Sequence, residues 1–259
     1  MAGLTYNTFV TQLAELAVVP LTVGSSPVTT QDSDFNAIIP SAIEYAENRI
    51  CRDIDLLSTV VASTALMTAG SPQMIIPYAT TGGNFITIQN INVITPSGTT
   101  VPNSGTRNPL LPVTKEFLQY AWPSNSGMGL PQYFAMQGSD STALGQGATS
   151  WTLNFGPWPD SSYTAEILGT IRPTTLSSAN PVTFISTFLA DLMLQAAMIF
   201  VSGYQRNFGK ESDDPTMAMS YEQQYKTLLQ GATGEEYRKK FAASAWTSMS
   251  SSPVATPGR

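Results

Sequence analysis

Residues 34–54, DFNAIIPSAIEYAENRICRDI, decide the architecture of this 259-residue chain. Apolar side chains recur in this stretch at steps of three and four residues, the spacing of one face of an α-helix. They are Phe35, Ile38, Ile39, Ala42, Ile43, Ala46, Ile50 and Ile54. Asp32 or Asp34 can cap the start of the helix. Pro40 predicts either a kink or a start at that residue.

Two further helical regions flank the middle of the chain. Thr5–Ala17 carries apolar residues at helical spacing, and the glycine and proline run at residues 24–27 ends it. Helical pattern returns after Pro181. Residues 183–209 are apolar on most sides, which predicts a long central helix.

The C-terminal part predicts two more helices and a tail. Asp213–Pro215 is a typical helix start, because acidic residues favour the N-terminus and proline the first helical position. Thr233–Glu236 has the pattern of a capping box, which predicts a last helix running to about Ala243. Residues 244–259 are rich in serine, alanine and proline without an apolar period, so we expect an extended tail.

Residues 67–180 differ from both ends because they hold 12 of the 19 glycines and 11 of the 18 prolines. Short β-branched and aromatic runs between these turn residues predict strands. The predicted strands are Gln73–Pro77, Asn84–Ile94, Gln132–Met136, Ser150–Phe155 and Thr164–Ile171. Trp151–Phe155 alternates strictly, as expected for a sheet with one buried face.

The order of these segments predicts an α+β fold. We expect residues 1–66 and 181–243 to form a helical bundle domain from the N- and C-terminal segments. Residues 67–180 are expected to form an inserted domain, either an antiparallel β-sheet or a small sandwich.

Charged residues make up 12% of the chain, about half the usual share of roughly 25%. Such a chain has large neutral surfaces, and these are the surfaces that pack against neighbouring proteins. The net charge of −6 and the few basic residues argue against tight binding to DNA, which needs clustered lysine and arginine.

The residue types needed for most catalysis are missing. The chain has no histidine, which excludes Ser–His and Cys–His mechanisms, and its single cysteine, Cys51, is expected to be a buried thiol. No phosphate-binding or dinucleotide-binding motif is present. We therefore predict that the protein is not an enzyme and has no catalytic residue, cofactor or metal site.

The carboxylates have simpler interpretations than catalysis. The pairs Asp32/Asp34, Asp53/Asp55 and Asp213/Asp214 lie at predicted helix ends, where capping accounts for them. Glu44 and Glu47 are interpreted as a solvated or ion-paired helix edge. A two-carboxylate glycosidase stays open as an alternative, and its candidates in the strand-rich middle are Glu116, Asp140, Asp160 and Glu166.

No membrane association is expected. The N-terminus lacks the basic and apolar regions of a signal peptide. The most apolar stretch, Phe184–Val201, contains Asp191 and Gln195, which favours a buried helix over a membrane span.

Arg49, Arg52 and Asp53 form a candidate ion-pair site near the end of the first long helix. On a helical wheel Asp53 falls inside the apolar stripe, where a carboxylate needs a partner. Arg49 lies one turn earlier and can supply that partner within the helix. A partner in a neighbouring subunit is the alternative.

Several motifs together resemble the head-to-tail adaptor (connector) proteins of tailed phages. Ala46–Leu56, AENRICRDIDL, is similar to a helix-end signature of that family. Gly129–Ala135 resembles its Pro-x-x-Tyr element. Leu153–Asp160 and Gly169–Pro173 resemble its strand and Pro-x-Pro passage.

The resemblance implies a structural virion protein that forms a homo-oligomeric ring, usually of twelve subunits. One face of the ring would dock on the portal protein, and the other would receive the tail or nozzle protein. Genomic DNA would pass through the channel without sequence-specific binding. The protein would be assembled in the host cytoplasm and would lie at the head–tail interface of the virion.

Within that expectation, we predict that the tail at residues 244–259 extends along the portal. Trp246 and Met249 are its expected anchors, since buried aromatic residues dominate interfaces. Two alternatives remain. The protein could be another neck or tail-tube component, or it could be a carbohydrate- or receptor-binding module that uses Trp122, Trp151 and Trp158 as a stacking platform.

Overall fold

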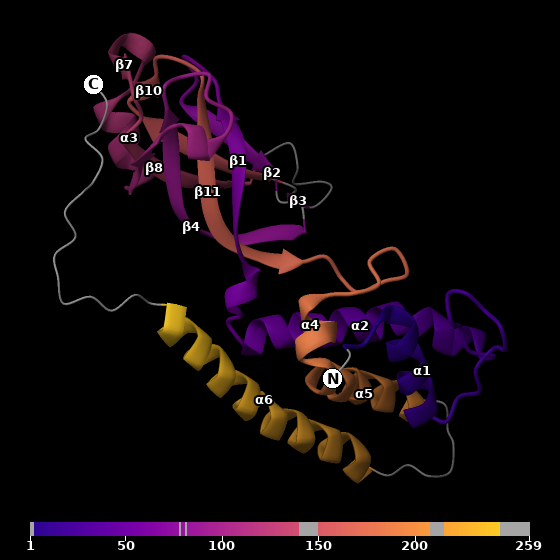
Figure 1. Ribbon diagram of the computed structural model, residues 1–259. Coiled ribbons are helices and arrows are strands. Elements are labelled where there is room, and N and C mark those ends of the chain that lie inside the picture. The colour runs from indigo at the N-terminus through magenta and orange to yellow at the C-terminus, as the bar shows by residue number, and fades with distance from the viewer. Residues whose placement is uncertain (1–2, 78, 81, 140–149, 208–214, 244–259) are drawn as a thin grey trace. The chain divides into compact units, whose positions relative to one another are not determined.

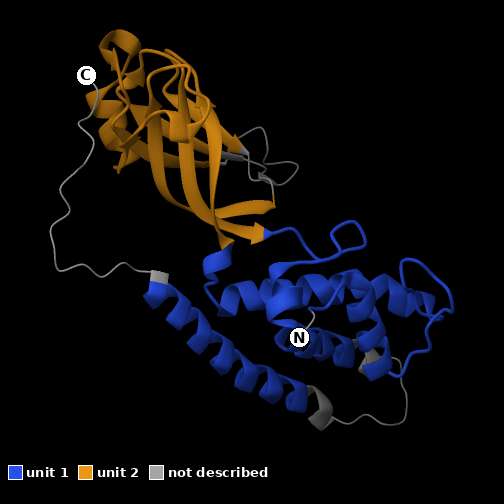
Figure 2. Cartoon of the chain, in the orientation of Figure 1, with its two compact units in different colours: residues 1–58, 173–246 blue, residues 59–172, 247–259 orange. Residues whose placement is uncertain are grey.

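The computed structural model describes residues 3–77, 79–80, 82–139, 150–207 and 215–243 (Figure 1). It divides into two compact units, which are coloured separately in Figure 2. Unit 1 contains the described residues up to Ser58 and from Pro173 onward, and unit 2 contains Thr59–Arg172. Unit 1 is helical and unit 2 is built from strands, so the predicted α+β fold is confirmed.

In the part of unit 1 that the structure describes, there are five α-helices. They are α1 Tyr6–Leu16, α2 Ser33–Asp53, α4 Phe184–Phe188, α5 Ala190–Asn207 and α6 Pro215–Ala243. The side chain of Asp32 caps α2 by accepting hydrogen bonds from the backbone N–H groups of Asp34 and Phe35. Because this cap sets the start of the helix, Pro40 lies inside α2, and the alternative start at Pro40 is wrong.

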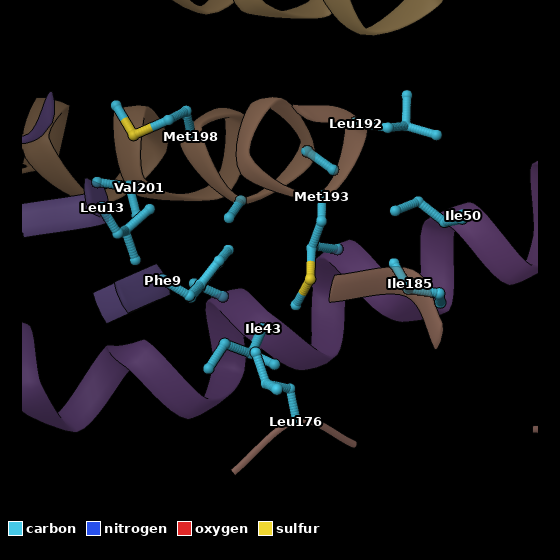
Figure 3. Packing of buried hydrophobic residues seen from close by; sticks show 14 of the residues in the cluster. Phe9, Leu13, Ile43, Ile50, Leu176, Ile185, Leu192, Met193, Met198 and Val201 are labelled. Atoms are coloured by element: carbon cyan, nitrogen blue, oxygen red, sulfur yellow. The ribbon is translucent and has the colours of Figure 1, made fainter. Parts of the chain in front are cut away.

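The core of unit 1 is the seam between α2 and α5, closed from one side by α1 (Figure 3). Ile43 and Ile50 of α2 and Met193 of α5 are fully buried there, together with Phe9 and Leu13 of α1. Burying each such side chain stabilises the fold by about 1.5–3 kcal/mol. Alanines at positions 42, 46, 196 and 197 are also fully buried, so the two long helices approach each other closely.

The long helix expected over residues 183–209 is instead two helices. Thr183 caps α4 in a capping box with Ser186, and the chain leaves helical geometry at Leu189, where φ is −125° and ψ is 37°. The break allows Ile185, Leu189 and Leu192 all to be buried in the core. A segment that is apolar on most sides gives no periodic signal at such a break, which is why the sequence did not predict it.

The capping box expected at Thr233–Glu236 is also absent, because α6 continues through it. The Thr233 hydroxyl donates a hydrogen bond to the carbonyl of Leu229 one turn earlier, as is common inside a helix. Helix α6 begins at Pro215 as predicted. Asp213, Asp214 and the tail at residues 244–259 lie outside the described residues.

The described residues of unit 2 form two larger sheets and a small one. Its strands are β1 Val60–Met67, β2 Gln73–Pro77, β3 Ala79–Thr80, β4 Gly83–Thr95, β5 Thr106–Pro109, β6 Leu111–Pro112, β7 Met128–Gly129, β8 Tyr133–Ser139, β9 Ser150–Gly156, β10 Trp158–Pro159 and β11 Tyr163–Pro173. One sheet has the order β1-β11-β4-β3 with β5 also on β4, the second has the order β2-β9-β8-β6, and β10 pairs with β7.

The two larger sheets share one apolar core. Ile91 and Ile167 come from the first sheet, and Leu153, Phe155 and Phe134 come from the second. The pairings on which this core rests, such as β1 with β11 and β8 with β9, are antiparallel. A short helix that the sequence analysis did not predict, α3 Lys115–Ala121, packs on β8 and β9.

The chain passes between the units after Ser58 and after Arg172, earlier than the boundaries expected at residues 66 and 180. The first difference arises because Val60–Met67 forms β1, which pairs with β11 along its whole length. No glycine or proline precedes this strand within ten residues to mark the change from helix to strand. The chain passes back into unit 1 where β11 ends, at Pro173.

Candidate functional site

The predicted ion-pair residues lie where the end of α2 meets α6. A guanidinium nitrogen of Arg49 donates to Glu222 Oε1 of α6 at 2.7 Å, and Arg49 Nε lies 3.7 Å from Asp53 Oδ2. The hydroxyl of Tyr225, also on α6, donates to Asp53 Oδ2 at 2.7 Å. The Arg49 guanidinium lies over the Tyr225 ring, 4.2 Å from its centroid. These four residues therefore join two helices of one chain.

The electrostatics of this cluster favour the charged forms of Arg49 and Glu222 and the neutral hydroxyl of Tyr225. The hydrogen bond from Arg49 lowers the pKa of the Glu222 carboxyl, and the same contact raises the pKa of Arg49. Burial, followed by the bond to Asp53, raises the pKa of Tyr225. The side chain of Asp53 is about one third exposed, so it lies at the edge of the apolar face of α2 and not inside it.

Arg52, the third predicted residue, points to solvent at the end of α2. The described residues provide it with no ion pair. It is therefore separate from the cluster that contains Arg49 and Asp53.

A second group of contacts holds the other end of α6. Lys240 forms an ion pair with Asp55, and the backbone N–H of Leu57 donates to Glu236 Oε2 at 3.1 Å. Glu236 is only 4% exposed and also accepts from Lys239. Asp53 and Asp55 were expected to act as helix caps, but both bind side chains of α6 instead.

Glu47 of α2 is buried, which corrects the expectation of a solvated helix edge. Its carboxylate accepts the backbone N–H of Leu176, with both oxygens 3.2 Å from that nitrogen, and it accepts from the Thr183 hydroxyl at 3.4 Å. Burial outweighs these hydrogen bonds and raises the pKa of Glu47 to about 7.

Glu47 and Glu236 each bind a backbone N–H group in unit 1, close to a point where the chain leaves or re-enters that unit. Leu57 lies just before the first passage, and Leu176 lies just after the second. In unit 1, each passage is therefore held by a backbone hydrogen bond to a buried carboxylate. Neither role follows from a local sequence pattern, because the two backbone donors lie 129 and 179 residues away from their acceptors.

Two of the four glycosidase candidates, Glu166 and Asp160, make side-chain contacts within the described residues. Glu166 is bound by Arg107 and Asn92, and Asp160 accepts a hydrogen bond from Tyr163. Across the described ranges, no three His, Cys, Asp or Glu side chains gather in a way that could hold a metal ion. In the same ranges, no helix has the length and apolar character to cross a membrane. The proposed tail anchors, Trp246 and Met249, lie outside the described residues.

Comparison with known proteins decides the family. A family model described as SU10 adaptor protein matches residues 5–256. The chain belongs to the SU10 adaptor protein family. No curated protein matched the adaptor. The resemblance to phage head-to-tail adaptors that was seen in Ala46–Leu56 and the later motifs is thereby confirmed, and the adaptor is a structural component of a phage virion.

Removing the Arg49–Glu222 contact tests how α6 is held. Arg49→Met should lower the free energy of unfolding by about 1 kcal/mol or somewhat more, because the pair is partly buried and charge-assisted. Lys226→Met is the matched control, since Lys226 lies 3.3 Å from the same Glu222 oxygen but is 67% exposed. Its effect should be close to zero. Urea denaturation measures both variants, and equal effects would contradict a specific role for Arg49.

The raised pKa of Glu47 predicts a pH dependence with a defined sign. Because the folded-state pKa of about 7 lies above the ordinary glutamate value of 4.5, the contribution of this group to stability is full below about pH 4.5. It is lost as the pH rises through 7, with a total change on the order of 3 kcal/mol. Wild type should therefore lose stability relative to Glu47→Gln between pH 5 and pH 8.

The exposed Glu44 provides the control for this measurement, because it lies on the same helix. Glu44→Gln should run parallel to wild type over the same pH range. A constant difference in unfolding free energy between wild type and Glu47→Gln from pH 5 to pH 8 would show that Glu47 is not the titrating group.

Proposed function

We propose that the adaptor forms a ring, with twelve subunits as the expected number, that docks on the portal protein and connects it to the tail. The observation that carries this proposal is the family match over residues 5–256. Head-to-tail adaptors are expected to dock on the portal, to bind a tail or nozzle protein and to let DNA pass, and we extend these roles to this chain.

The surface of α6 supports a role in subunit packing. Among the α6 residues whose burial the structure describes, the exposed ones are Met219, Ser220, Gln223, Gln224, Lys226, Thr227, Gln230, Gly231, Glu235, Tyr237, Arg238, Phe241 and Ala242. Only three of these are charged, and Met219, Tyr237 and Phe241 are more than two thirds exposed. A neutral face with large apolar side chains suits an interface between subunits.

Arg52 is the residue that we propose for a contact across this interface. Arg49 and Asp53 already bind Glu222 and Tyr225 of their own chain, which favours a structural role for that cluster. Arg52 sits beside them on the solvent side of α2 and forms no ion pair with the described residues of the same chain.

The charge of the chain is compatible with the passage of DNA. Each subunit carries a net charge of −6, so a ring of twelve would carry roughly −72. A channel with net negative charge repels phosphate groups, and DNA would therefore slide through without being held.

Removal of the C-terminal tail tests both the adaptor role and the proposed tail contact. A chain ending at Ala243 keeps every described element and should fold like wild type, as checked by circular dichroism. Wild type added to portal-bearing heads should bind to them and make them competent for tail addition. The truncated chain should not remain bound, because Trp246 and Met249 are missing.

The double variant Trp246→Ala, Met249→Ala keeps the full-length chain. It therefore separates the effect of these two side chains from the effect of a shorter tail. It should reproduce most of the defect if these two side chains are the anchors. Normal binding of the truncated chain to heads would contradict the tail contact, and failure of wild type to bind heads would contradict the adaptor role itself.

A further inference from the structure

Strand β1 leaves one edge of the first large sheet of unit 2 without a partner strand among the described residues. It stands at the end of the order β1-β11-β4-β3, and its eight residues pair with β11 without a break in register. Its sequence, VVASTALM, contains no charged residue and no proline. Edge strands are normally protected from pairing with other chains by charges, prolines or bulges. Strand β1 has none of these protections, so its free edge is suited to pair with a further strand.

Strand β8 leaves a second edge open, in the other large sheet. Its neighbour β6 pairs only with Tyr133 and Phe134, whereas β8 continues to Ser139. The backbone N–H of Val113, just after β6, donates to the carbonyl of Phe134 at 2.9 Å. Because alternate residues of a strand direct their backbone groups to the same side, Met136 is the next residue to face this edge. No described strand pairs with Met136 on that side.

The open edge of β8 lies beside a cavity of about 590 Å³. Met136 of β8, Ile88 of β4 and the segment that leads into α3 line this cavity. Phe134, also in the lining, belongs to the apolar core of unit 2, and Ile88 packs against that core. The charged side chains of the lining are Lys115 and Glu116, whose charges balance. The opening therefore offers an incoming strand backbone partners together with a mostly apolar surface of zero net charge.

The two open edges lie on opposite sides of unit 2 (Figure 1). Strands β1 and β2 contact each other and mark one side, because each stands at the end of its sheet. Strands β4 and β8 line the same cavity and mark the other side, since β11 separates β4 from β1 and β9 separates β8 from β2. A molecule with two different complementary surfaces can associate head to tail, and contacts of this kind can close into rings.

Charge and closure favour a second copy of this chain as the partner. Strand β1 brings no charge, and the charges beside β8 balance, so these two surfaces do not repel each other although each chain carries a net charge of −6. In a closed ring every β1 meets a β8, which leaves neither edge exposed. A different partner on one of the edges would leave the other edge open to unwanted pairing.

We propose that β1 of one copy pairs with the free edge of β8 in the next copy, so that the sheets of neighbouring units continue into one another. This contact rests on the proposed ring and names the surfaces that close it. It uses residues of unit 2 only, so it is separate from the α6 face and from the portal contact.

Variants that block one edge each test this pairing. Thr64→Lys combined with Leu66→Lys places two charges at exposed positions of β1, and Met136→Lys places one charge in the opening beside β8. Because burying an unpaired lysine is costly, each variant should stay monomeric at protein concentrations at which wild type forms the ring. The added lysines reduce the net charge of −6, so general repulsion between copies does not account for this loss.

An equimolar mixture of the two variants distinguishes head-to-tail pairing from other contacts. Each variant keeps one intact edge, so the mixture should form a dimer with one copy of each and nothing larger, as measured by native mass spectrometry. Tyr120→Lys is the control, because Tyr120 is 89% exposed on α3 and does not line the cavity, and this variant should form the ring. Circular dichroism and thermal unfolding check that all variants fold.

Hydrogen exchange of the wild-type chain provides a test that needs no variant. Alternate amide groups of β1 and the amide of Met136 face the free edges, so they should exchange about tenfold or more slowly in the ring than in the diluted monomer. Unchanged exchange at both edges on ring formation would overturn the pairing.

The outcomes separate this contact from the proposed function. Ring formation by either folded edge variant at the wild-type concentration overturns the pairing of β1 with β8 and leaves the proposed ring intact. Absence of the mixed dimer, with both variants folded and monomeric, also overturns the pairing. A wild-type chain that forms no ring at any concentration contradicts the proposed function itself, and the pairing with it.

Discussion

The packing of α2 against α5 is the contact on which the rest of the structure depends. The two helices belong to segments that are separated by all of unit 2, so the core of unit 1 forms only when both ends of the chain come together. The entropy cost of closing such a loop grows only slowly with its length, and unit 2 has a core of its own that keeps its ends ordered. The fully buried Ile43, Ile50 and Met193 supply the apolar contact that offsets this cost.

Burial of two carboxylates at the chain passages is a second consequence of this arrangement. An inserted unit requires two backbone segments to leave and re-enter unit 1, and their N–H groups need acceptors there. Glu236 accepts from Leu57 at one passage, and Glu47 accepts from Leu176 at the other. A buried glutamate is costly, which is why the pKa of Glu47 rises to about 7, but an unpaired backbone N–H in the same place would also be costly.

The sequence predicted those parts of the fold that depend on local patterns. The apolar period of residues 34–54 and the β-branched runs such as Asn84–Ile94 correspond to α2 and β4 in the structure. Strand β1 was missed because no turn residue marks its start, and the break at Leu189 was missed because its surroundings are apolar on most sides.

Contacts between distant segments could not be predicted in this way. The helical spacing of Arg49 and Asp53 predicted a possible pair, but their partners Glu222 and Tyr225 lie more than 170 residues further along the chain. The interpretation of Glu47 failed for the same reason, because only the folded chain shows that Leu176 covers it. The motifs at Ala46–Leu56, Gly129–Ala135 and Leu153–Asp160 indicated the adaptor family together, whereas the low content of charge indicated only large neutral surfaces that pack against neighbours.

The mass of the assembled protein, measured by native mass spectrometry with and without the purified portal, tests whether the chain forms a ring that binds the portal. We expect a closed ring, with twelve copies as the expected number, that binds the portal as one complex. A chain that stays monomeric at every concentration and ignores the portal would contradict it.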